Sequence, residues 1–282
     1  MGALVLGFPG GGHGGTVIRL ALLALAYVVY FSIYGGLALW VSALARTSRS
    51  SLVILVGLWG LFCLIAPRVS SELSVALRPL PSEAALKRNI AKTLEMGIDG
   101  KTERESAIDA MVKDLMAEKG FANTGMLVAD AHLTGLELQA EAKWEDDAYD
   151  HHVTALNRQI QAQENAAHWL AWVSPYLAMR ALSAGLSGTD FAHHRDFTEY
   201  AETWRKAFVR KLNETFAEKA GAQGWDYRAG AELWKQAPPF TYREPSPTFA
   251  LQHHWPNVFA LLFWLAVALF GAHVFARRVR VV

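Results

Sequence analysis

The stretch that decides the fold is residues 20–45, LALLALAYVVYFSIYGGLALWVSALA, which contains no charged side chain. Two further runs, residues 50–67 and 256–276, are also free of charged side chains. A helix that crosses a bilayer needs about 20 predominantly apolar residues, within a range of about 17–25. The first run, with 26 residues, is long enough to tilt; the second, with 18, just reaches the range, and the third has 21. The sequence therefore predicts three membrane-spanning helices.

The polar residues are concentrated in one long stretch between the second and third runs. All 26 acidic residues lie between Arg68 and Trp255, with 21 of the 27 basic ones, so this stretch of 188 residues has a net charge of −5. The six basic residues outside it are arginines, and five of these lie at Arg46 and Arg49 in the first turn and at positions 277, 278 and 280 after the last run. Short loops rich in Lys and Arg stay on the cytoplasmic side of a membrane.

We therefore predict an all-α membrane protein with three transmembrane helices and a large, mainly helical extracytoplasmic domain between the second and third. Residues 1–16 are expected to form an extracytoplasmic glycine-rich loop, and 17–67 the first two spans with a short cytoplasmic turn. Residues 68–255 are expected to form the extracytoplasmic domain, and 256–282 the last span with a basic cytoplasmic tail. Such a protein is expected to cross a membrane several times.

Local signals divide the polar stretch into helices. Proline at position 67 predicts the end of the second span, and Ser82 predicts a helix cap. The motif Thr102-x-x-Glu105 is typical of a capping box and predicts a helix to about position 119. Residues 130–168 contain no proline and predict one long helix, with Gly135 as the position where a break is the alternative. Thr189 or Asp190 is expected to cap a further helix, and a proline-rich connector is expected to lead back to the membrane.

Two further features of the polar stretch concern aromatic side chains. Residues 169–176, WLAWVSPY, are too short to span a bilayer and are expected to rest on the membrane surface or to pack beneath the polar domain. The helix after Asp190 is expected to bury one apolar stripe by ordinary core packing. Its members recur three or four residues apart, namely Phe197, Tyr200, Trp204, Phe208 and Leu212.

Several motifs resemble ligand sites but lack the required context. Gly10-x-Gly12-x-x-Gly15 matches a dinucleotide fingerprint formally, yet it precedes a membrane helix and no βαβ unit surrounds it. Gly100-Lys101-Thr102 resembles the end of a phosphate-binding loop, but Glu95 stands where that loop needs glycine.

The histidines also predict no metal site, and no hydrolase motif predicts a catalytic site. Asp150 and His152 are two apart on a predicted helix and so do not share a face for a metal. The pairs His193-His194 and His253-His254 are expected to be surface or interfacial. The chain has no His-Glu-x-x-His and no Gly-x-Ser-x-Gly. We therefore expect no catalytic residue, no cofactor and no metal.

The spans contain no acidic residue, lysine or arginine, so an intramembrane proton relay is not expected. Energy for transport would have to come from another protein. Their aromatic residues have two interpretations: Tyr34, Trp40 and Trp59 line a substrate path, or they serve for interfacial anchoring and helix packing.

An ordered set of short motifs resembles the C-terminal portion of ABC-2 type transporter permeases, in a bacterial branch with a large extracytoplasmic insert of unassigned function. The set runs through almost the whole chain. Its members are Ser42-Ala43-Leu44-Ala45-Arg46 with Ser48-Arg49, Ala66-Pro67-Arg68, Pro79-x-Pro81-Ser82, Gly97-Ile98-Asp99-Gly100, Asp150-x-His152, Gly188-Thr189-Asp190-Phe191, Ala201-Glu202 with Arg205, Leu212-Asn213 and Leu233-Trp234.

The resemblance implies a transport subunit that is not itself an enzyme and that works with a separate cytoplasmic ABC ATPase. The three predicted spans would be the fourth, fifth and sixth of a six-span half-transporter in a bacterial cytoplasmic membrane. A second permease half, or the missing N-terminal spans, and membrane lipid would be its other partners, and no nucleic acid is expected. Arg46 and Arg49 would face the ATPase, and Gly188, Thr189, Asp190 and Phe191 would be a family motif of the insert. A membrane-anchored envelope interaction module without transport activity is the alternative.

Overall fold

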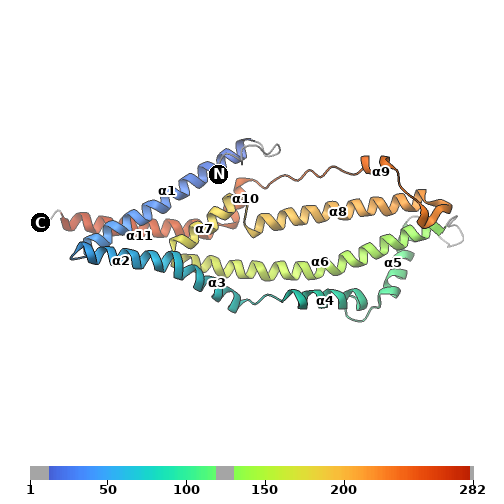
Figure 1. Cartoon of the computed structure of the whole chain (residues 1–282), viewed down its shortest axis with the longest axis horizontal. Helices are drawn as coiled ribbons and strands as arrows, with labels where there is room; N and C mark the ends of the chain where they lie inside the picture. Colours follow the sequence, from blue (N-terminus) through green and yellow to red (C-terminus); the bar gives the residue numbers. More distant parts are fainter. Residues whose placement is uncertain (1–12, 119–129, 280–282) are drawn as a thin grey trace. The chain divides into compact units, whose positions relative to one another are not determined.

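The structure is a computed structural model that describes residues 13–118 and 130–279, and every regular element within these ranges is a helix (Figure 1). Contacts divide the chain into two compact units. The first unit comprises residues 1–79, 160–197 and 243–282, and the second comprises residues 80–159 and 198–242. The prediction of a helical protein is confirmed for the described part of the chain. The division differs from the expected domains because residues 160–197 associate with the apolar helices.

Three helices of the first unit are long and apolar enough to cross a membrane: Gly14–Leu44, Ser48–Leu77 and Trp255–Val274. They correspond to α1 (His13–Leu44), to α2 (Ser48–Gly60) with η2 (Leu61–Ile65) and α3 (Ala66–Leu77), and to most of α11 (Trp255–Val279). Many of their large apolar side chains are exposed, such as Phe31, Val53 and Phe270 at 65–71%. Apolar surface of this extent is typical of contact with lipid. The prediction of three apolar spanning helices is confirmed by length and composition.

Two predicted boundaries of these helices are wrong. Gly14 and Gly15 belong to α1 and not to a loop, whereas Gly10 and Gly12 lie outside the described residues. Pro67 does not end the second apolar helix, which continues to Leu77.

A π-helical turn explains how the helix passes Pro67. The turn η2 closes with the backbone N–H of Ala66 bonded to the carbonyl of Leu61. Proline has no N–H, so the next carbonyl along the turn, that of Phe62, lacks a donor from the helix. The Ser174 hydroxyl donates to this carbonyl over 3.0 Å. Because a side chain from another segment replaces the missing bond, the helix remains continuous.

Small residues bring α1 and α11 close together. A Cβ atom added at Gly36 would lie 2.8 Å from the Cβ of Ala268, and one added at Gly271 would lie 2.4 Å from the Trp40 ring. Glycine at these positions therefore permits a contact that any larger residue would disturb. Ile33, fully buried on α1, belongs to the same core.

The WLAWVSPY segment packs against α11. It contains the end of α6 (Asp130–Leu170), the short η4 (Ala171–Val173) and the start of α7 (Pro175–Leu186). The Trp264 indole donates to the carbonyl of Trp172 over 3.0 Å, and the ring centroids of Trp172 and Phe263 are 5.6 Å apart. Trp169 is 74% exposed.

The proline-rich connector expected before the last span is helical at its end, where α10 (Pro247–His253) forms.

The second unit contains α4 (Glu83–Met96), α5 (Arg104–Glu118), most of α6, most of α8 (Phe191–Lys219), η5 (Gly221–Asp226) and α9 (Ala231–Lys235). The Ser82 hydroxyl accepts from the backbone N–H of Ala85 over 3.2 Å, which confirms the predicted cap. The capping box at Thr102 is wrong. The Thr102 hydroxyl donates to the Asp99 carboxylate over 2.8 Å, and α5 begins at Arg104.

Within this unit α6 and α8 meet through a glycine and through ion pairs. A Cβ atom on Gly135 would lie 2.4 Å from that of Ala217, so glycine permits the close contact of the two helices here. The helix α6 runs through Gly135 without a break. Lys206 contacts Asp150 over 2.5 Å, and the His152 ring bonds the Thr93 hydroxyl over 2.8 Å. Asp150 and His152 are therefore directed to different partners.

The aromatic stripe of α8 is covered in part by the chain that follows it. The rings of Tyr200 and Trp204 pack against Phe240, with centroids 5.3 and 5.7 Å away. The Trp204 indole also donates to the carbonyl of Pro238 over 2.9 Å. The prediction that the stripe serves packing is supported, with Phe197 remaining 43% exposed.

Candidate functional site

Asp190 occupies a defined turn between α7 and α8. Gly188, with a φ of 70°, ends α7: its N–H bonds the carbonyl of Gly185, and the next N–H, that of Thr189, bonds the carbonyl of Ala184. This pair of bonds is a Schellman motif, in which glycine tolerates the left-handed backbone. Asp190 then caps α8, because its Oδ1 accepts from the N–H of His193 over 3.1 Å. The predicted cap at this position is confirmed.

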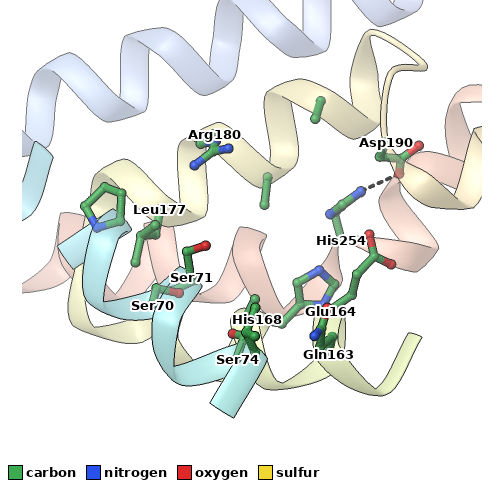
Figure 2. A pocket seen from close by; sticks show the side chains of 16 residues that line it. Ser70, Ser71, Ser74, Gln163, Glu164, His168, Leu177, Arg180, Asp190 and His254 are labelled. Carbon is green, nitrogen blue, oxygen red and sulfur yellow. Dashed lines mark hydrogen bonds and ion pairs between the residues drawn. The ribbon is translucent and has the colours of Figure 1, made fainter. Parts of the chain in front are cut away.

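Two buried histidines surround the Asp190 carboxylate. His193 Nδ1 bonds Oδ1. His254 Nε2 bonds Oδ2 over 2.7 Å, as Figure 2 shows. The side chains of all three residues are only 5–7% exposed. Of the two expected placements for His193 and His254, surface or interfacial, the exposed surface is therefore wrong. The polar groups of these histidines point inward because a buried carboxylate needs hydrogen-bond donors.

The neighbours of each ring define its proton positions. Arg19 Nη2 lies 3.4 Å from His193 Nε2, and since a guanidinium can only donate, Nε2 is the acceptor and Nδ1 carries the proton given to Asp190. On the other side the Asn257 amide nitrogen lies 3.2 Å from His254 Nδ1. With the amide donating there, His254 Nε2 carries the proton that faces Asp190.

Arg19 supplies the opposite charge for this cluster. Its guanidinium also donates to the carbonyls of Leu186 and Pro245, over 3.3 and 2.5 Å. Burial raises the pKa of the Asp190 carboxyl, but the hydrogen bonds from His193 and His254 lower it by more, so the net pKa is below its ordinary value. The Asp190 cluster, which is Arg19, His193, Asp190, His254 and Asn257, thus joins α1, α8 and α11 through hydrogen bonds.

A cavity of about 360 Å³ lies beside the Asp190 cluster. Its walls come from α3, from the C-terminal part of α6 and from α7, and Asp190 and His254 contribute to the end wall (Figure 2). Apolar side chains such as Leu177 and Val75 line it together with polar ones. The polar members are Ser70, Ser71, Ser74, Gln163, Glu164, His168, Arg180, Asp190 and His254.

Two titratable groups of the cavity are shifted toward neutrality. Burial, followed by repulsion from Asp190, raises the pKa of Glu164, although His254 and Arg195 lower it. Burial, followed by the neighbouring His254, lowers the pKa of His168 to about 4. Its ring centroid is 5.5 Å from that of His254. At neutral pH the imidazole of His168 therefore carries no charge into the cavity.

The residues expected to line a substrate path do not meet in this cavity. The Tyr34 hydroxyl lies 3.5 Å from the Cys63 sulfur, Trp40 packs over Gly271, and Trp59 is 52% exposed. Their assignment to a path stays a prediction. Arg46 lies in the turn before α2 and Arg49 in its first helical turn, and both side chains are exposed.

One family model matches part of the chain. Residues 121–243 match a family model described as a domain of unknown function, DUF3526. The match takes in less than half of the 282 residues. It includes Glu164, Arg180 and Asp190 but neither Arg19 nor His254. No curated protein and no solved structure matches the chain.

The four residues expected to form a family motif make the turn that places Asp190 in the Asp190 cluster. Gly188 provides the positive φ, Thr189 closes the Schellman turn, Asp190 accepts from both histidines, and Phe191 begins α8. Sequence reasoning missed His193, His254, Glu164 and His168 as members of a site. A usable signal was present for His193 alone, because Asp190-x-x-His193 places both side chains on one helical turn.

Proposed function

We propose that the chain is the permease subunit, or part of the permease subunit, of an ATP-driven ABC-2 type exporter. The observation that carries the proposal is the combination of three long apolar helices with a large polar helical segment between the second and third. The ordered motifs that resemble the C-terminal portion of such permeases support it.

The proposed orientation has the turn at Arg46 and Arg49 and the C-terminal tail in the cytoplasm. Both arginines are exposed and close to the ends of apolar helices, as the positive-inside rule requires. The polar segment then lies on the outer side of a bacterial cytoplasmic membrane. In this orientation the basic turn is available to a cytoplasmic ABC ATPase.

A permease of this kind needs two arrangements of its spans, and ATP binding by the partner shifts the balance between them. The close contact of α1 with α11 and the π-turn before Pro67 are the features on which such a shift would act. A second permease half, or further spans, would complete the pathway through the membrane.

The orientation is tested with single cysteines in a Cys63→Ser background. Ser106→Cys and Ser48→Cys are exposed to a membrane-impermeant thiol reagent in intact cells. We expect labelling at position 106 and protection at position 48 until the cells are opened. Labelling of position 48 alone in intact cells would refute the orientation and, with it, the exporter.

Function is tested by reconstituting the full chain with a cytoplasmic ABC ATPase from the same cells and measuring ATP hydrolysis in proteoliposomes. We expect hydrolysis to depend on the chain and to fall when Arg46 and Arg49 are both replaced by alanine. Replacement of Arg68, an exposed arginine paired with Glu72, is the matched control. An ATPase that neither binds the chain nor responds to it would count against transport.

A membrane-anchored interaction module is the second candidate, favoured by exposed indoles on the second unit. Trp225 and Trp234 are 67% and 61% exposed, and tryptophan is enriched where proteins bind one another. This function requires only that the polar segment be held at the membrane. It would survive the exchange of the three apolar helices for an unrelated anchor, whereas transport would not.

A further inference from the structure

The cavity beside the Asp190 cluster retains two charged groups that the protein itself does not pair. Among the described residues, no hydrogen bond or ion pair joins Glu164 or Arg180 to another side chain, although Asp190 repels and Arg195 and His254 attract the Glu164 carboxylate electrostatically. Asp190 differs, because it accepts hydrogen bonds from His193 and His254 and has Arg19 nearby as its counter-charge. The cavity therefore offers one free carboxylate and one free guanidinium.

These two groups come from different walls. Glu164 is half-buried on α6, next to His168 and Asp190, and Arg180 is an exposed residue of α7. Figure 2 shows Arg180 on the side of Ser71 and Leu177, and Glu164 on the side of His254. A ligand that is only anionic would be repelled by Glu164, and one that is only cationic would be repelled by Arg180. The arrangement fits a ligand that carries both charges.

The third wall provides hydroxyl groups. Ser70, Ser71 and Ser74 lie on one side of α3 and line the cavity. Ser74 is 7% exposed, and its hydroxyl oxygen is buried without a hydrogen-bond partner in the part of the chain that the structure describes. A buried hydroxyl without a partner costs stability. A bound molecule with acceptor oxygens would satisfy it.

The cavity lies where two candidate spans meet polar residues. Its serine wall, α3, is the last part of the candidate span Ser48–Leu77, and His254 directly precedes the candidate span that starts at Trp255. Its volume of about 360 Å³ is within the range of about 300–1,000 Å³ typical of small-molecule sites. An amphiphile could therefore place its polar group in the cavity and its chains along the apolar helices.

We propose that this cavity binds a phosphoethanolamine group, with the ammonium at Glu164 and the phosphate at Arg180 and the serines of α3. Guanidinium and hydroxyl groups are suitable donors for phosphate oxygens, and a primary ammonium gives up to three hydrogen bonds to carboxylate and carbonyl oxygens. A quaternary ammonium has no such donors, so a choline headgroup is disfavoured. The group could belong to a membrane phospholipid or to a soluble molecule, and the site does not depend on transport.

The first arm of the test measures lipid retained by the full chain. The protein is extracted from nanodiscs with equal parts of phosphatidylethanolamine, phosphatidylcholine and phosphatidylglycerol, and bound lipid is identified by native mass spectrometry. We expect phosphatidylethanolamine to be enriched on the wild-type protein. Glu164→Gln and Arg180→Gln are each expected to weaken this enrichment about tenfold or more, as the loss of a charge-assisted hydrogen bond implies.

The matched control is Glu72→Gln, which removes one negative charge from an exposed residue of α3 that does not line the cavity. It is expected to retain lipid as the wild type does. Because Arg180 is exposed, Arg180→Gln is expected to fold normally, as circular dichroism would verify. Ser74→Ala is a further variant, expected to reduce the enrichment by a smaller factor.

The second arm uses soluble phosphoethanolamine and delipidated protein, with binding followed by saturation-transfer NMR. Binding here together with lipid enrichment shows that the headgroup is recognised. Enrichment alone identifies the lipid as the source, and binding alone identifies a soluble molecule. The proposal is refuted if neither arm shows binding, if the other two lipids are retained equally, or if the Glu164 and Arg180 variants behave like the Glu72 control.

Discussion

Replacing Asp190 by asparagine tests whether the buried cluster holds the first unit together. The substitution keeps the shape of the side chain and an oxygen for the helix cap, where asparagine and aspartate perform equally well. It replaces the other oxygen by an amide nitrogen, which cannot accept from His254 Nε2. It also removes the charge that faces Arg19 through His193.

The expected loss of stability follows from these contacts. A hydrogen bond to a charged group contributes about 1.5–3 kcal/mol, and Asp190 makes two such bonds to imidazoles in a buried environment. One bond is lost and the other weakened, so we expect a decrease of about 2–4 kcal/mol in the free energy of unfolding. Asp190→Ala should lose about 1 kcal/mol more, because the cap of α8 is then removed as well.

The assay is thermal unfolding of the full chain in detergent micelles, followed by circular dichroism. With about 2–4 °C per kcal/mol for a chain of this size, Asp190→Asn should lower Tm by about 4–16 °C. Glu72→Gln, an exposed carboxylate whose pair with Arg68 is solvent-accessible, is the control and should change stability by less than about 0.5 kcal/mol. Equal Tm values for Asp190→Asn and this control would refute a stabilising role for the cluster.

The same variant changes the response to acid. The pKa of Asp190 is lower in the folded protein than in the unfolded chain, so its contribution is present above the unfolded pKa of about 3.9. The contribution is lost as the pH falls through the folded pKa. Between pH 4 and pH 2 the wild type should therefore lose stability more steeply than Asp190→Asn. Parallel Tm profiles for the two proteins would contradict this linkage.

Three further predictions concern packing, the π-turn and the cavity. Gly271→Ala should destabilise by about 1–3 kcal/mol in thermal unfolding, since its Cβ would overlap an indole, whereas Gly57→Ala, where the space is open, should stabilise slightly. Ser174→Ala should cost about 1–3 kcal/mol by leaving the π-turn carbonyl without a donor, and the exposed Ser32→Ala should be neutral on the same measurement. The pKa of His168 is lowered to about 4 in the folded protein. As the pH decreases from 6.5 to 4, the unfolded chain therefore binds a proton that the folded protein does not, and the free energy of unfolding decreases. His168→Gln should flatten that part of the Tm profile and leave the opposite contribution of Glu164, whose pKa is raised.

Local signals were sufficient for most of the helices. The long charge-free runs predict α1 and α11 because a span needs little beyond length and apolar composition. The caps at Ser82 and Asp190 and the long α6 follow from residue types within a few positions of one another. The boundary at Pro67 failed for a reason that lies far away in the sequence. A serine at position 174 satisfies the carbonyl that a proline would otherwise leave without a donor.

The Asp190 cluster was not predictable by the same means. His193 follows Asp190 by one helical turn, but His254 is 64 residues away from Asp190 and Arg19 is 174 residues away from His193. The order of the motifs contains no information on which of them meet in space. The histidine pairs were therefore assigned to surface or interfacial positions, since histidine is intermediate in burial and its long-range partners cannot be read from the sequence.

Arg19 has a structural role that the distribution of charges along the sequence does not indicate. In the sequence it is one of six arginines outside the polar stretch and the only one on the predicted outer side. In the structure its guanidinium is bonded to the carbonyls of Leu186 and Pro245 and lies beside His193. Arg19 therefore lies opposite a buried carboxylate and joins α1 to the segments around positions 186 and 245. The positive-inside rule counts lysine and arginine whether or not an acidic group lies near them, so the asymmetry stays at five outlying arginines on the predicted cytoplasmic side and one, Arg19, on the other.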